Sequence, residues 1–212
     1  MQKNSTTRLP LMSDIDRRTA MMGAASLGTV ALLAPQPAAA LAVKDAENLI
    51  RQVTREVQSI INSGQSQAAL IRKFEGVFQK YADVPRIAAT LLGPPWRSAN
   101  SADRTAYVRA LTGYLARKYG KRFREFIGGQ IIVRDARKVK SFYEVKTTAI
   151  LKGVAPFDVS FFVSDKSGKD LFFDMRIEGI SLVNSEKQEI GAMLEKRGGN
   201  LDRLIADLKK LG

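Results

Sequence analysis

The chain contains neither cysteine nor histidine in its 212 residues. Without cysteine there is no disulfide framework, no thiol nucleophile, no cysteine-ligated zinc and no acylated cysteine of a lipoprotein. Without histidine there is no Ser-His-Asp triad, no imidazole base and no histidine-ligated metal. These absences exclude most of the familiar hydrolytic enzymes. Only a pair of carboxylates, or a metal site built from carboxylates alone, is left open.

Charged residues are also missing from the stretch between Thr19 and Val43. The paired Arg17-Arg18 precedes this stretch, and a small-x-small pattern, Ala40-Leu41-Ala42, lies near its end. This order is typical of a secretory signal peptide, and the paired arginines suggest twin-arginine export. The alternative is a retained membrane anchor, but an apolar run of about 15 residues falls short of the roughly 20 that a spanning helix needs. We predict a twin-arginine-like signal peptide over residues 1–42 and one domain over residues 43–212.

The balance of charge is strongly basic, with 34 Lys and Arg against 21 Asp and Glu. Residues 1–42 hold four of the basic and two of the acidic residues, so their removal lowers the net charge from +13 to +11. Such a charge favours nucleic acid or an anionic membrane surface as partner. Since export leads to a compartment with anionic lipid and little nucleic acid, we expect a periplasmic protein with transient membrane contact and no nucleic-acid partner.

Apolar residues recur at helical spacing on both sides of a region that alternates like strands. The pattern predicts helices at 44–62, 67–81, 84–92, 101–127, 186–196 and 201–211, with Ser66 as the cap of the second helix and Asp83 directly before the third. The alternation predicts strands at 143–151, 157–163 and 171–177, and a weaker strand at 130–133. After Gly179 the apolar positions change parity, which indicates a β-bulge. We therefore predict an α+β fold in which helices cover one face of a curved antiparallel sheet of about four strands.

No motif for catalysis is found. The sequence has neither a phosphate-binding P-loop nor a dinucleotide fingerprint. Asp174 and Glu178 share a strand face but stand four residues apart, roughly 13 Å, which is too far for the carboxylate pair of a glycosidase. We therefore predict a protein that is not an enzyme and that needs neither a cofactor nor a metal ion.

One side of the long helix predicted at 101–127 carries seven cations. A solvated helix face explains them without any partner. Alternatively, this face meets anionic headgroups or an acidic protein, and for that role we single out Arg117, Lys121 and Arg124.

A set of short motifs, in order over residues 44–211, resembles one known family. The motifs are Tyr81-Ala82-Asp83-Val84, Leu91-Leu92-Gly93, Trp96-Arg97, Asp103-Arg104, Val145-Lys146-Thr147 and Asp174-Met175-Arg176-Ile177-Glu178-Gly179. The chain resembles the MlaC-type phospholipid-binding proteins, also called the toluene-tolerance auxiliary family. One departure is Phe172-Phe173 before Asp174, where the family often has Trp.

The resemblance implies a monomeric periplasmic carrier that works without ATP. Such a carrier shuttles a glycerophospholipid between an inner-membrane ABC transporter complex and an outer-membrane lipoprotein complex, and so maintains outer-membrane lipid asymmetry. The acyl chains would lie between the sheet and the helices, with the headgroup near solvent. A hopanoid-associated branch is similar in sequence, so a hopanoid is an alternative cargo.

For the acyl-chain pocket we expect inward residues of the strands and of the helices that face them. The candidates are Ile87, Leu91, Leu92, Trp96, Tyr107, Leu111, Leu115, Val145, Thr147, Ala149, Val159, Phe161, Met175 and Ile177. The same pattern also suits an ordinary core. A lipid carrier further predicts a cavity at or above the upper end of the usual 300–1,000 Å³, because two acyl chains are bulky. Two other hypotheses stay open: a non-catalytic envelope scaffold and an exported hydrolase with a carboxylate site.

Overall fold

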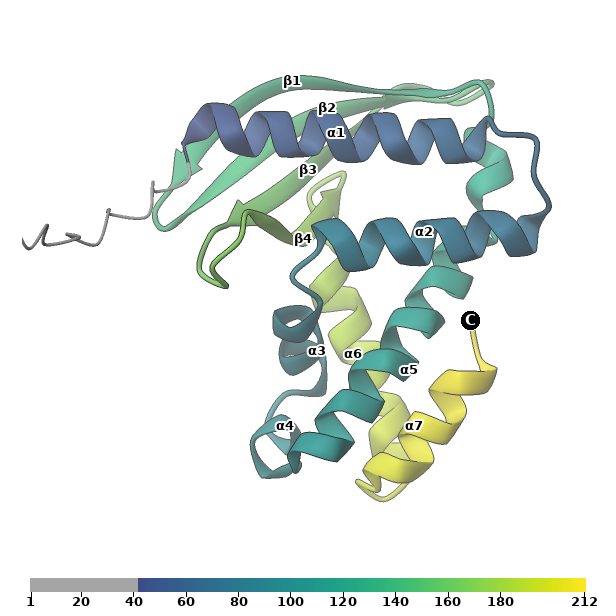
Figure 1. The fold of residues 1–212 in the computed structure, drawn as a ribbon, viewed down its shortest axis with the longest axis vertical. Coiled ribbons are helices and arrows are strands. Elements are labelled where there is room, and N and C mark those ends of the chain that lie inside the picture. Colours follow the sequence, from purple (N-terminus) through teal and green to yellow (C-terminus); the bar gives the residue numbers. More distant parts are fainter. Residues whose placement is uncertain (1–41) are drawn as a thin grey trace, which may run out of the picture. The chain divides into compact units, whose positions relative to one another are not determined.

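The computed structural model describes residues 42–212, so the predicted signal peptide lies outside the described residues except for its last position. The described part runs from helices to strands and back to helices (Figure 1). Its helices are α1 Val43–Ile61, α2 Gln67–Tyr81, α3 Val84–Leu92, α4 Pro95–Ser98, α5 Ser101–Gly120, the 3₁₀ turn η1 Phe123–Phe126, α6 Leu182–Lys196 and α7 Leu201–Lys210. Its strands are β1 Gln130–Val139, β2 Phe142–Ile150, β3 Phe157–Ser164, β4 Leu171–Ile177 and β5 Ile180–Ser181.

The five strands form one antiparallel sheet in the order β1-β2-β3-β4-β5, in which each strand pairs with its neighbour in the chain. This arrangement confirms the predicted α+β class. The fifth strand, β5, has only two residues and was not expected.

Strand β1 is ten residues long, whereas its apolar pattern predicted four. Its second half is rich in exposed charge, with Arg134, Asp135, Arg137 and Lys138. The pairing with β2 also shifts by one residue between Val133 and Asp135, so a single alternation does not run through the strand. An edge strand with one irregularity and a solvated half lacks the period-2 signal by which strands are recognised.

The parity change at Gly179 marks a hairpin turn, so the predicted β-bulge is wrong at this place. Ile177 pairs directly with Ile180, and the two residues between them, Glu178 and Gly179, both have positive φ, at 48° and 80°. Two consecutive residues with positive φ make the tight turn that suits the twist of an antiparallel hairpin. The chain therefore reverses into β5 and leads straight into α6.

Helix α5 ends at Gly120, seven residues before the predicted end, where it passes close to α2. A Cβ atom on Gly120 would lie 2.7 Å from Cγ1 of Ile71, so only glycine allows this approach. A turn and the 3₁₀ segment η1 follow, and they bring Phe126 back toward the sheet side of the molecule.

Several helix starts are fixed by side chains that cap them. Ser66 accepts a hydrogen bond from the Ala69 N–H, and Asp83 accepts one from Arg86, as their positions before the two helices predicted. Helix α6 begins at Leu182, earlier than predicted, because Ser181 caps it. The carboxylate of Asp174 on β4 accepts further hydrogen bonds from the Ser181 hydroxyl and the Val183 N–H.

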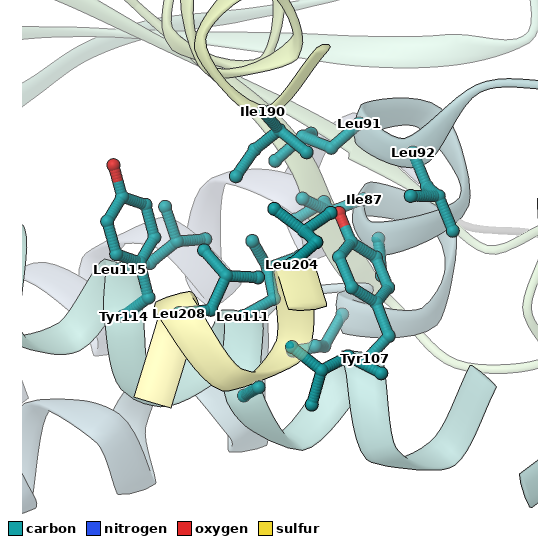
Figure 2. Packing of buried hydrophobic residues seen from close by; sticks show 14 of the residues in the cluster. Ile87, Leu91, Leu92, Tyr107, Leu111, Tyr114, Leu115, Ile190, Leu204 and Leu208 are labelled. Carbon is teal, nitrogen blue, oxygen red and sulfur yellow. The ribbon is translucent and has the colours of Figure 1, made fainter. Parts of the chain in front are cut away.

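Helices α3, α5, α6 and α7 share one apolar core, which is shown in Figure 2. Leu111 and Tyr107 of α5, Leu204 and Leu208 of α7, and Ile190 of α6 are fully buried there. A second cluster lies between the sheet and α1, where Ala46 and Ile50 meet the inner side chains of β1–β3. The sheet and the helical layer are therefore each consolidated by packing of their own.

Replacing Leu204 by Ala should destabilise the fold by about 2–5 kcal/mol, because the change leaves a cavity in the helical core. Urea unfolding followed by circular dichroism would measure the loss. Leu211, which is 48% exposed, is the matched control, and its change to Ala should stay within about 0.5 kcal/mol. Equal losses for both variants would contradict the assignment of this core.

Candidate functional site

A cavity of about 490 Å³ lies between the sheet and the helices. Its wall is mainly apolar and draws on α1, α2, α3, α5, η1, the first four strands and α6. Six of the lining side chains are phenylalanines, at positions 74, 78, 126, 157, 161 and 172. The volume is ordinary for a small-molecule site and smaller than the upper end that two acyl chains predicted. The six phenyl rings occupy part of the space between the sheet and the helices.

Eight of the fourteen residues expected to contact a lipid line this cavity. They are Ile87, Leu91, Leu115, Ala149, Val159, Phe161, Met175 and Ile177. They come from α3, α5, β2, β3 and β4, so the structure brings together residues that are up to 90 positions apart in the sequence.

The other six lie in packed cores away from the cavity wall. Leu92, Tyr107 and Leu111 belong to the core of the helical layer, and Trp96 packs against it with its ring 6.4 Å from that of Tyr107. Val145 is buried beneath α1. Thr147 is also buried, and its hydroxyl donates to the Val159 carbonyl at 2.8 Å. Their spacing in the sequence is the same as that of the lining residues, because a packed core and a cavity wall both require apolar residues on the inward face of a helix or strand.

Much of the wall comes from α1 and α2, which the list of expected residues omitted. These helices contribute Val53, Thr54, Val57, Ile61, Phe74, Val77 and Phe78. The apolar faces of both helices were evident from their spacing, but spacing gives no sign that α1 covers only part of the sheet. The remaining apolar lining residues lie on η1, on the strands, on the β2–β3 loop and at the start of α6.

The few charged lining residues differ in their exposure. Arg122 and Glu125 are exposed and form an ion pair of 3.1 Å, and Val154 on the β2–β3 loop is 55% exposed. These residues mark where the cavity meets solvent. Asp174 also lines the cavity, but its carboxylate is occupied by the start of α6. Asp174 and Glu178 thus serve the fold, since Glu178 accepts a hydrogen bond from the Asp158 N–H.

A polar network joins α5 to α6 next to the cavity. The Lys118 ammonium donates to Glu186 and to Glu189, each at 2.6 Å, and the Tyr119 and Tyr114 hydroxyls donate to the same two carboxylates at 2.6 Å. Burial opposes the charge on Lys118, but the hydrogen bonds to the two carboxylates outweigh it and raise its pKa. Burial, and then the hydrogen bond to Glu189, raise the pKa of Tyr114 to about 12.

The three basic residues singled out for docking have different environments. Arg117 donates to the carbonyl oxygens of Leu208 at 2.6 Å and Leu211 at 2.9 Å, so it holds the end of α7. Lys121 and Arg124 are exposed. The charges of Lys121 and Arg124 are therefore accessible to a partner, whereas the Arg117 guanidinium is engaged by α7.

Residues 42–212 show neither a membrane-spanning helix nor a cluster of metal-binding side chains. Within that range, no helix is both long and apolar enough to cross a bilayer. The same residues contain no group of three or more acidic side chains placed to hold a metal ion.

Residues 51–210 match the family model described as MlaC protein. The chain belongs to the MlaC family. This family comprises non-catalytic lipid carriers that bind phospholipid, and membership in it implies a periplasmic location. The resemblance expected from the sequence motifs is therefore confirmed.

The MlaC fold is also found in a solved structure. A phospholipid-binding protein from Ralstonia solanacearum, determined in complex with a phospholipid, matches with a TM-score of 0.66 at 18% identity. The match covers 77% of this chain and 98% of the Ralstonia chain. At this identity the likeness establishes a shared fold.

The α5–α6 network predicts a loss of stability in acid. Hydrogen bonds from Lys118 and then Tyr114 lower the pKa of Glu189 below its usual 4.5. A lowered pKa means that the carboxylate stabilises the folded state above about pH 4.5 and that this stabilisation is lost as the pH falls. We expect the melting temperature to fall below pH 4.5, and the fall to be shallower for Glu189→Gln. Glu195→Gln, an exposed position on the same helix, should keep the wild-type pH dependence; a wild-type profile for Glu189→Gln would contradict this role.

Proposed function

We propose that this chain is a periplasmic carrier that holds a phospholipid by its acyl chains and passes it between two membrane complexes. The donor and acceptor would be an inner-membrane ABC transporter complex and an outer-membrane lipoprotein complex, in support of outer-membrane lipid asymmetry. The observation that carries the proposal is the apolar cavity between sheet and helices in a chain of the MlaC family. The signal peptide predicted for residues 1–42 agrees with export to the same compartment.

The composition of the cavity wall suits acyl chains better than a polar ligand. Apolar side chains line the interior, and the exposed charged residues of the wall, Arg122 and Glu125, stand where it meets solvent. A lipid held this way would keep its headgroup near water. The transfer free energy of about 30 methylenes from water to an apolar site is on the order of 24 kcal/mol. A free lipid therefore does not cross an aqueous gap without a carrier. The Ralstonia protein, which has the same fold, was solved with a phospholipid bound.

The size of the cavity bears on how the cargo is held. About 490 Å³ lies within the range of small-ligand sites and below the volume expected for two chains. We infer that loading involves rotation of some of the phenylalanine side chains that line the wall. Side-chain rotations of this kind cost little compared with backbone movement.

Protein recovered from the periplasm should contain about one phospholipid per chain when solvent extracts are analysed by mass spectrometry. The matched pair Met175→Trp and Met193→Trp then localises the site, because both methionines are half-buried but only Met175 lines the cavity. The larger indole at 175 should reduce the bound lipid several-fold, at a stability cost of about 1–3 kcal/mol that applies to both variants.

The outcomes of that experiment separate the hypotheses. Hopanoid in place of phospholipid would keep the carrier and change its cargo. A protein that is empty, and stays empty after incubation with vesicles, would favour the non-catalytic scaffold. Equal lipid loss in both methionine variants would place the lipid elsewhere.

The exposed cations after α5 are proposed to assist docking on membranes or partner complexes. Because Lys121 and Arg124 are exposed while Arg117 holds α7, charge reversal should be made at the first two only. We expect Lys121→Glu/Arg124→Glu to weaken binding to anionic vesicles at low salt, as measured by sedimentation, with the difference vanishing at high salt. Lys196→Glu/Arg203→Glu, two exposed residues around the α6–α7 turn, carries the same charge change and should bind like the wild type. Unchanged binding of the first variant would rule out the docking role.

A further inference from the structure

Glu186 on α6 is a buried carboxylate in the wall of an apolar cavity. The residue is 4% exposed and lines the cavity. Its Oε1 atom accepts hydrogen bonds from the Lys118 ammonium and the Tyr119 hydroxyl, each at 2.6 Å. Its other oxygen, Oε2, is buried and has no hydrogen-bond partner within residues 42–212.

An unpartnered carboxylate oxygen is unfavourable in a buried place, because it has lost water without gaining another donor. Two other buried side-chain atoms in the described part of the chain also lack a partner, Nη1 of Arg86 and the Tyr107 hydroxyl. Neither of these residues lines the cavity. Glu186 thus differs from them in that it lines a space where a ligand can supply the missing donor.

The charges around Glu186 favour a donor that is neutral or positive. Lys118 is the cation of the network, and it is shared by the two carboxylates of Glu186 and Glu189, which leaves one negative charge in excess. Arg122 is paired with Glu125, and the Asp174 carboxylate accepts hydrogen bonds from the start of α6. A phosphate would be repelled here. A hydroxyl would satisfy the acceptor, and an ammonium group would satisfy both the acceptor and the charge.

The position of Glu186 suits a headgroup rather than the end of an acyl chain. Its partner Tyr119 stands three residues before Arg122, which is exposed where the cavity meets solvent. Its other partner, Lys118, connects it to the half-exposed side chain of Glu189. The network therefore runs from the cavity wall to the surface within one or two helical turns.

We propose that Oε2 of Glu186 accepts a hydrogen bond from a hydroxyl or ammonium group of the lipid headgroup, so that the cavity prefers lipids that carry such a donor. The inference rests on the proposed lipid-carrier function. Phosphatidylethanolamine offers an ammonium donor and phosphatidylglycerol a hydroxyl donor. Phosphatidylcholine carries a quaternary ammonium group without any N–H or O–H, so it is the matched lipid that lacks the donor.

The test is competition among these three lipids, with identical acyl chains, in equimolar vesicles incubated with delipidated protein. The protein is then recovered and its lipids are quantified by mass spectrometry. A charge-assisted hydrogen bond should enrich one donor lipid over phosphatidylcholine roughly tenfold. Enrichment of phosphatidylethanolamine would identify the ammonium, and enrichment of phosphatidylglycerol the hydroxyl. Equal loading of all three would overturn the inference while leaving the carrier function standing.

Two variants locate the preference at Glu186. Glu186→Gln keeps an oxygen for Lys118 and Tyr119 but places an amide N–H₂ where Oε2 stands, so it should abolish the enrichment. Glu195→Gln removes an exposed carboxylate of the same helix that does not line the cavity, and it should keep the enrichment. Enrichment that persists in Glu186→Gln would overturn the assignment. Absence of bound lipid in the wild type would instead overturn the proposed function and this inference with it.

The wild-type protein alone provides a second measurement that does not depend on the folding of a variant. Stepwise N-methylation of phosphatidylethanolamine removes its donors one at a time without removing its charge. Retention should fall at the last step, from the dimethyl to the trimethyl headgroup, because only then is no N–H left. A constant retention through the series would exclude the ammonium as the donor.

Discussion

The apolar face of the curved sheet is divided between contact with α1 and the wall of the cavity, and the rest of the structure depends on this division. Helix α1 packs on β1–β3 through Ala46 and Ile50 and closes one part of the face. Other side chains of the same face, among them Val159 and Met175, also line the cavity. Helices α2, α5 and α6 close the space from the other side. An apolar surface left uncovered in this way is costly in water, so it favours an apolar ligand.

The helical layer has an apolar core of its own, and this core supports one side of the cavity. Its core of α3, α5, α6 and α7 is packed with fully buried side chains such as Leu111, Leu204 and Ile190 (Figure 2). Polar contacts then fix the layer to the sheet. Asp174 on β4 holds the start of α6, and within the layer the Lys118 network holds α6 to α5. Because these contacts set the distance between layers, collapse of the sheet onto the helices is opposed by packing already in place.

The sequence predicted the order of elements well because period and capping are local properties. Ser66 and Asp83 cap the helices that follow them, and the alternation of apolar and polar residues in β2 and β3 is regular. The failures lie where tertiary contacts decide: Gly120 ends α5 against Ile71, and β1 continues through a charged segment because β2 pairs with it. For the cavity, the sequence supplied apolar residues but could not separate Leu91, which lines the wall, from Leu92, which is buried in the core. The free oxygen of Glu186 depends on three residues from two helices and has no signature in sequence.

Strand β1 is an open edge of the sheet, and its composition bears on how the protein behaves among other copies of itself. A ten-residue edge exposes backbone groups to which a second strand can add, and such addition leads to aggregation. Here the strand carries Arg134, Asp135, Arg137 and Lys138 at exposed positions and breaks its register after Val133. Exposed charge and local irregularity are the means by which natural sheets avoid edge-to-edge pairing. The same segment that obscured the strand in the sequence thus protects the folded sheet from strand addition.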